Sequence, residues 1–202
     1  MKMLLEKIGR FNEQYAIVEN EKAVFSVEYA EFHWNEAENA GCFIGNRYGL
    51  VNMARDLMLT AAVCESIDAG SHEYTTRFED GSDEVIILKK KPAHKTDGLI
   101  QIDWRETRGN GQSDEVLYLE NILEMMNGVI ESFHEEEIAP AKIEWDRYNR
   151  AAFIIGTAFG LVLLAREFVQ FALSASLDES YEVGPLHEDG GRLVLVLKDN
   201  SI

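Results

Sequence analysis

Apolar residues recur at helical spacing in two long segments of the chain. Between Glu115 and Glu136, apolar side chains fall within an arc of about 120° on a helical projection, which predicts an amphipathic helix. This face comprises Leu119, Ile122, Leu123, Met126, Val129, Ile130 and Phe133. The segment Arg47–Glu65 carries a similar stripe of Leu50, Met53, Ala54, Leu57 and Ala61. A third, buried helix is expected from about Asp146 or Phe153 to Ser174, because the uncharged run Ala151–Ala165 is too short to cross a bilayer.

Shorter segments have the alternating or β-rich pattern of strands. Segments in which apolar and polar residues alternate, or in which branched side chains cluster, are predicted to be strands. These segments are Gln14–Glu19, Ala23–Phe32, Ser71–Phe78, Glu84–Lys90, Leu99–Thr107, Lys142–Trp145 and Leu193–Leu197. Asp80-Gly81 is a hairpin signal between two of them. Met1–Arg10 has the spacing of a short helix, and Asn35–Gly41 is expected to be a polar loop.

Part of the pattern occurs twice. Ile44–Ala61 matches Ile155–Ala172 at an offset of 111, and at the same offset Trp34 matches Trp145. After a slip of two residues, Val85–Lys89 matches Val194–Lys198. An internal repeat of this kind sets the architecture of the whole chain.

The expected fold is therefore α+β. It consists of two related halves in a pseudo-two-fold arrangement, each an antiparallel sheet covered by a long helix. The halves are residues 1–91 and 98–202, with the seam near Lys91–Gly98, and the helix at 115–136 is inserted in the second half. Asn46 and Thr157 are the expected N-caps of the two repeated helices.

Charge is the feature that sets this composition apart. The formal net charge is −17, while 46% hydrophobic and 27% charged residues are ordinary for a globular protein. A chain this acidic repels phosphate backbones, so nucleic-acid binding is disfavoured. The negative electrostatic field of such a chain would attract a basic protein partner. The same charge can equally serve only to keep the protein soluble. Two cysteines and no signal-peptide or membrane-spanning pattern predict a cytoplasmic protein without disulfides.

The usual catalytic and metal-binding signatures are missing from the sequence. Gly45-x-x-x-Gly49 lacks the lysine and hydroxyl residue of a P-loop, so these glycines are interpreted as close-packing positions at the start of a helix. His134 and His187 stand beside acidic residues without the spacing of a metal site. The sequence therefore predicts a protein that is not an enzyme and uses no cofactor or metal.

The helix at 115–136 carries the candidate binding surface. Its polar side presents four glutamates at helical spacing, namely Glu120, Glu124, Glu131 and Glu135, with Asp114 and Glu115 near the beginning. From Gln112 to Ala141 there are eight acidic residues and neither lysine nor arginine. Like charges four residues apart cost a few tenths of a kcal/mol. Two interpretations stand side by side, namely a face for a basic partner and a solvated face of an acidic protein.

A short motif points to a family. The motif runs through Gly45-Asn46-x-x-Gly49-Leu50, His72-x-Tyr74 and Asp80-Gly81-Ser82-x-Glu84-Val85. It resembles small immunity proteins of bacterial toxin–immunity loci, although Tyr74 stands where that family has a second histidine. The resemblance implies a non-catalytic protein that neutralises a toxin by binding it in the cytoplasm. The acidic surface of this chain would suit a basic toxin, such as a nuclease.

Two other hypotheses remain open at this point. One is an enzyme or small-ligand protein with a cleft between the halves that uses His72, His33 or Cys64. The other is a structural subunit that forms a homodimer through Phe153–Leu173.

Overall fold

The computed structural model describes residues 29–62, 73–76, 82–89, 112–133, 140–184, 186 and 188–198. The predicted elements Met1–Arg10, Gln14–Glu19 and Leu99–Thr107 and the seam at Lys91–Gly98 lie outside these residues.

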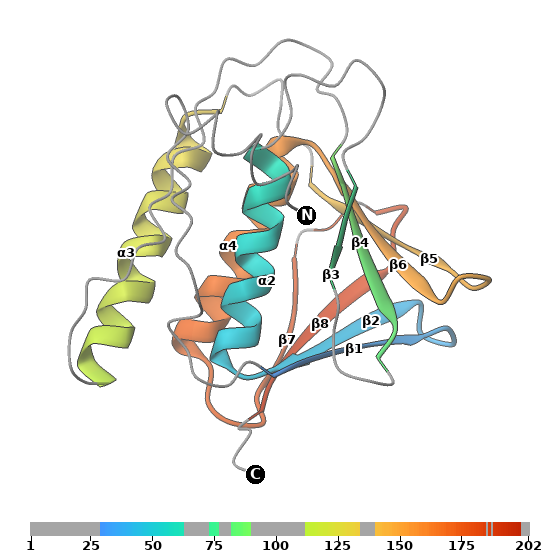
Figure 1. Ribbon diagram of the computed structural model, residues 1–202, viewed down its shortest axis with the longest axis horizontal. Coiled ribbons are helices and arrows are strands. Elements are labelled where there is room, and N and C mark those ends of the chain that lie inside the picture. Colours follow the sequence, from blue (N-terminus) through green and yellow to red (C-terminus); the bar gives the residue numbers. More distant parts are fainter. Residues whose placement is uncertain are drawn as a thin grey trace.

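The described chain is an α+β fold of two four-stranded sheets and three helices. The elements in chain order are β1 (Ala30–Asn35), β2 (Ala40–Gly45), α2 (Arg47–Ala62), β3 (Glu73–Thr76), β4 (Glu84–Lys89), α3 (Gln112–Glu131), β5 (Lys142–Asp146), β6 (Ala151–Gly156), α4 (Ala158–Ser174), β7 (Ser180–Glu182) and β8 (Arg192–Leu197). Figure 1 shows the helices on one side of the molecule and the strands on the other. Among the described helices, none is long and apolar enough to cross a membrane.

The two sheets combine strands from both sides of α3. One sheet has the order β1-β2-β8-β7 and the other has the order β3-β4-β6-β5. The expectation that each half forms its own antiparallel sheet was therefore wrong. Each sheet contains two antiparallel hairpins, one from before and one from after α3, which meet through a parallel central pair, β2 with β8 and β4 with β6.

The composition of the central strands explains this arrangement. Strands buried on both faces, as in parallel pairs, have nearly continuous apolar runs instead of strict alternation. Val85–Leu88 and Leu193–Leu197 are such runs: Val85, Ile87, Leu193, Leu195 and Leu197 are buried on one face, and the residues between them are half-buried on the other. Strand pairing is a long-range property, so these runs could indicate central strands but not their neighbours.

Two segments differ from their predicted structure. Ala151–Gly156 is strand β6 and not the beginning of a helix, since α4 begins at Ala158 after the cap residue Thr157. A short apolar run does not distinguish a buried strand from a buried helix by periodicity. The expected loop Asn35–Gly41 is a tight turn of four residues, 36–39, between β1 and β2.

The N-caps of α2 and α4 are as predicted. Asn46 Oδ1 accepts the Gly49 N–H at 2.9 Å, and Thr157 Oγ1 accepts the Gly160 N–H at 3.3 Å. These bonds satisfy backbone donors that the first turn of a helix leaves free. The interpretation of Gly49 as a close-packing position is also confirmed, because a Cβ there would overlap the Tyr29 carbonyl oxygen.

The core lies between the helices and the sheets. Helix α4 packs against both α2 and α3, and it also contacts β6 and β8. The rings of Phe43 in β2 and Phe168 in α4 meet edge-to-face with centroids 5.2 Å apart. The segment Phe153–Leu173, considered above as a dimer contact, is therefore largely covered within one chain.

Side chains and backbone groups hold the two sheets together beside the hairpin turns. The indoles of Trp34 and Trp145 stack with centroids 5.4 Å apart. The buried carboxylate of Asp83, which precedes β4, accepts the Trp34 N–H at 2.9 Å and binds the Arg150 guanidinium at 2.5 Å. Trp34 belongs to the hairpin of β1 and β2 in one sheet, and Arg150 belongs to the hairpin of β5 and β6 in the other. The buried carboxylate of Asp83 therefore fixes the two sheets relative to each other.

Candidate interaction surface

Helix α3 lies at the edge of the helical layer, against α4, as Figure 1 shows. Its inner face is apolar, and Leu119, Ile122, Met126 and Val129 are buried there. Beyond the last turn, the ring of Phe133 meets Phe159 of α4 edge-to-face with centroids 5.4 Å apart. Each buried side chain of this size contributes about 1.5–3 kcal/mol. The apolar stripe therefore fixes which side of α3 faces solvent.

Three of the predicted binding residues lie on that outer side. The side chains of Glu120, Glu124 and Glu131 are exposed. Glu135 lies outside the described residues. Asp114 and Glu115 fall within the first turn of α3, which begins at Gln112, three residues earlier than predicted. We use "acidic face" below for Glu120, Glu124 and Glu131.

The carboxylates of the acidic face gather without a cation, whereas several carboxylates of the sheet side have one. On the sheet side, acidic residues pair with lysine or arginine, as Glu36 does with Arg147 at 3.3 Å and Glu144 with Lys142 at 2.5 Å. Further ion pairs are Glu167 with Arg166, Glu182 with Arg192 and Asp178 with Lys198. Within the residues that the structure describes, no ion pair or hydrogen bond engages a side chain of the acidic face.

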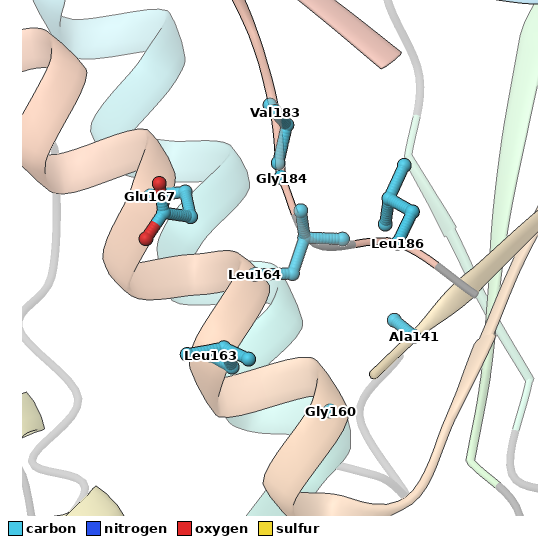
Figure 2. Close-up of a pocket in the computed structure, with 8 residues that line it drawn as sticks. All are labelled: Ala141, Gly160, Leu163, Leu164, Glu167, Val183, Gly184 and Leu186. Carbon is cyan, nitrogen blue, oxygen red and sulfur yellow. The ribbon is translucent and has the colours of Figure 1, made fainter. Parts of the chain in front are cut away.

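The described surface also has a shallow depression beside α4, drawn in Figure 2. It has essentially no room for a water-sized molecule, so it is far smaller than a ligand pocket. The lining is mostly aliphatic, from Ala141, Gly160, Leu163, Leu164, Val183, Gly184 and Leu186. Its one carboxylate, Glu167, accepts the Tyr181 hydroxyl at 2.8 Å, and this bond raises the pKa of Tyr181. The depression is thus a gap in the packing of α4 and offers no set of catalytic groups.

The residues suggested for a cleft enzyme are not brought together in the described part of the chain. His33 is exposed, and its Nε2 lies 3.1 Å from the carboxylate of Glu31. Two contacts lower the pKa of Glu31, namely a hydrogen bond from Tyr29, which has the larger effect, and the hydrogen bond with His33. Cys64 and His72 lie outside the described residues. In the same described part, no three His, Cys, Asp or Glu side chains gather as metal ligands.

One surface feature gave no signal in the sequence. The turn between β5 and β6 carries Tyr148 with its side chain 98% exposed, between Arg147 and Arg150. Arginine and tyrosine in a turn are unremarkable as a sequence pattern. The turn between β5 and β6 stands out only in the structure, where it lies beside the turn between β1 and β2.

No family model, no curated protein and no solved structure matches this chain.

Proposed function

We propose that this chain is a non-catalytic, cytoplasmic binding protein whose acidic face on α3 docks a basic protein. A toxin domain of the nuclease type is the partner that the family resemblance favours. The observation that supports the proposal is that no described residue pairs with the side chains of Glu120, Glu124 and Glu131, whereas several carboxylates of the sheet side pair with lysine or arginine. Glu135, Asp114 and Glu115 extend the surface in the sequence.

The energetics of α3 support a binding role over solubility alone. Glu120 and Glu124 stand four residues apart, so their repulsion costs the helix about 0.2–0.5 kcal/mol. Glu131 is the last residue of α3, where the helix dipole disfavours a negative charge. Any of these positions could hold lysine and keep the helix soluble. A basic partner would supply the missing cations and would be attracted from a distance by the net charge of −17.

We further propose that the chain arose by internal duplication, with α3 as the segment between the copies. The order β-β-α-β-β stands on both sides of α3. Ala40 pairs with Arg192 in one sheet, as Ala151 pairs with Glu84 in the other. Strands β2 and β6 share one burial pattern, and β4 and β8 share another.

These registers revise the alignment of the two copies. They match Glu84 with Arg192, so Val85 corresponds to Leu193 and not to Val194 as the sequence alone suggested. The slip after the helix is then three residues instead of two. The residues that the offset of 111 sets opposite α3, about 1–20, lie outside the part of the chain that the structure describes.

The test is charge reversal on α3 with a matched control. The proposal predicts that a neighbouring gene encodes a protein with a basic domain. We expect Glu120→Lys/Glu124→Lys to weaken binding to that domain by at least tenfold, measured by titration calorimetry. The control is Glu84→Lys/Glu188→Lys, which changes the net charge equally at exposed residues of the sheet side. The control should retain most of the affinity.

Salt dependence separates a specific face from general attraction. Binding through the acidic face should weaken steeply with ionic strength in the wild-type protein and less steeply in the α3 variant. If the α3 variant and the control lose the same amount of affinity, net charge alone explains the effect. Unchanged binding by the α3 variant would contradict the proposal.

A further inference from the structure

Helix α3 contains an asparagine followed by a glycine, Asn127-Gly128, and both residues are exposed. The side-chain carbonyl carbon of an asparagine, Cγ, is an electrophile that the backbone nitrogen of the next residue can attack. A side chain on that next residue hinders the attack, and glycine has none. Among the asparagines that the structure describes, Asn127 is the only one with a glycine after it.

No contact within the described chain requires the glycine. A Cβ at position 128 would have no atom within 4 Å, so the packing of α3 leaves room for a side chain there. Glycine inside a helix lowers its stability, because a more flexible backbone has to be ordered. Gly128 also lies in the last turn of α3, which ends at Glu131. Because helix ends open more readily than helix centres, the Asn–Gly bond lies where α3 should open most easily.

The side chain of Asn127 is free to react. It is exposed, and no hydrogen bond in the described chain holds its amide. Hydrogen bonds hold the side chains of Asn35 and Asn46, by contrast. Asn121 is exposed on the same helix, but the residue after it is the buried Ile122. Asn121 is therefore an internal reference that shares the helix and the exposure of Asn127 without the glycine.

We propose that Asn127 is a site of deamidation, by which the chain adds a negative charge to its own acidic face. When the last turn opens, the Gly128 nitrogen forms a bond to Asn127 Cγ. The proton of that nitrogen goes to the side-chain amide nitrogen, whose bond to Cγ breaks, and ammonia leaves. Water then hydrolyses the succinimide ring at either of its carbonyl groups, which gives aspartate or isoaspartate. The reaction consumes one water and involves no oxidation or reduction.

The product adds a carboxylate to the surface of α3. Position 127 lies three residues after Glu124 and four before Glu131, so the three side chains are neighbours on the helix. An aspartate there would repel both glutamates, close to a helix end where the dipole disfavours negative charge. The isoaspartate form also inserts a methylene into the backbone of the last turn. Deamidation should therefore weaken the end of α3, and this effect does not depend on the function proposed for the helix.

Incubation of the full chain at mildly alkaline pH, followed by peptide mapping with mass spectrometry, tests the reaction. We expect Asn127 to deamidate at least tenfold faster than Asn121, and faster as the pH rises, because the attacking nitrogen must lose its proton. Gly128→Ala should slow the reaction at Asn127 at least tenfold. The same comparison in concentrated urea, where α3 is unfolded, separates hindrance by the added methyl group from the added helix stability.

Asn127→Asp supplies the aspartate form directly. It should unfold at a lower urea concentration than wild type, because asparagine and aspartate have similar helix propensities and differ here in charge. High salt should reduce the difference by screening the repulsion. Two results would each overturn the proposal. They are a rate at Asn127 no greater than that at Asn121 in the folded chain, and a rate that Gly128→Ala leaves unchanged.

Discussion

Replacing Glu124 with lysine should make the protein more stable. Glu124 is exposed near the middle of α3, one turn after Glu120, and no cation in the described chain contacts either side chain. The change removes a repulsion of about 0.2–0.5 kcal/mol and creates a Glu–Lys pair in the favourable order, worth about 0.3–0.5 kcal/mol. Glutamate and lysine have similar helix propensities, and a central position feels little of the helix dipole.

The net gain is therefore about 0.5–1 kcal/mol in the free energy of unfolding. For a chain of this length such a gain raises Tm by about 1–4 °C. Urea unfolding followed by circular dichroism measures it directly. Glu124→Gln removes only the repulsion and should give about half of the gain. In about 1 M salt the difference between Glu124→Lys and wild type should nearly disappear, because the Debye length falls to about 3 Å.

A loss of stability in Glu124→Lys, or a gain that survives high salt, would refute this reasoning. Either result would mean that Glu124 has a favourable electrostatic partner or that the gain has another origin. If stability rises while binding to the basic partner falls, the acidic face costs the fold free energy and contributes to recognition. That combination distinguishes a binding surface from a solvated one.

Four further substitutions test the structure. Gly49→Ala should lose about 2–3 kcal/mol of stability because its Cβ would overlap backbone, whereas Gly128→Ala, at an open position in the last turn of α3, should gain up to about 0.5–1 kcal/mol, both by urea unfolding. Arg150→Asn tolerates positive φ but removes the cation from the buried carboxylate before β4, and should cost about 1–2 kcal/mol. The hydrogen bond to Glu167 raises the pKa of Tyr181 above its ordinary value of 10. The bond should therefore stabilise the fold fully below pH 10, and this stabilisation should be lost as the pH rises through the raised pKa of Tyr181. Glu167→Gln should lower that pKa in an absorbance titration at about 295 nm, with Tyr181→Phe as reference.

Local signals predicted local structure well in this chain. The stripe of α3, the caps Asn46 and Thr157 and the hairpin of β3 with β4 depend on neighbours a few residues apart. The periodicity of α3 also predicted correctly that Glu120, Glu124 and Glu131 face solvent. Each of these features follows from the geometry of one element.

The pairing of strands was not predictable in the same way. Val85–Leu88 and Leu193–Leu197 have the continuous apolar pattern of central strands, but nothing local tells β4 to pair with β6 instead of β8. The surroundings of Tyr148 were hidden for the same reason. Its meaning depends on the first hairpin, more than a hundred residues earlier in the chain, which lies next to it only in the folded state.

The topology separates the demands of folding from those of recognition. Each sheet needs strands from both sides of α3, so a change in a central strand affects the packing of both halves. Helix α3 packs on α4 and belongs to neither sheet. Substitutions on its outer face therefore leave strand register and core packing unchanged. A chain with this topology can acquire a new partner at α3 while its fold stays the same, which is why the proposed binding surface lies there.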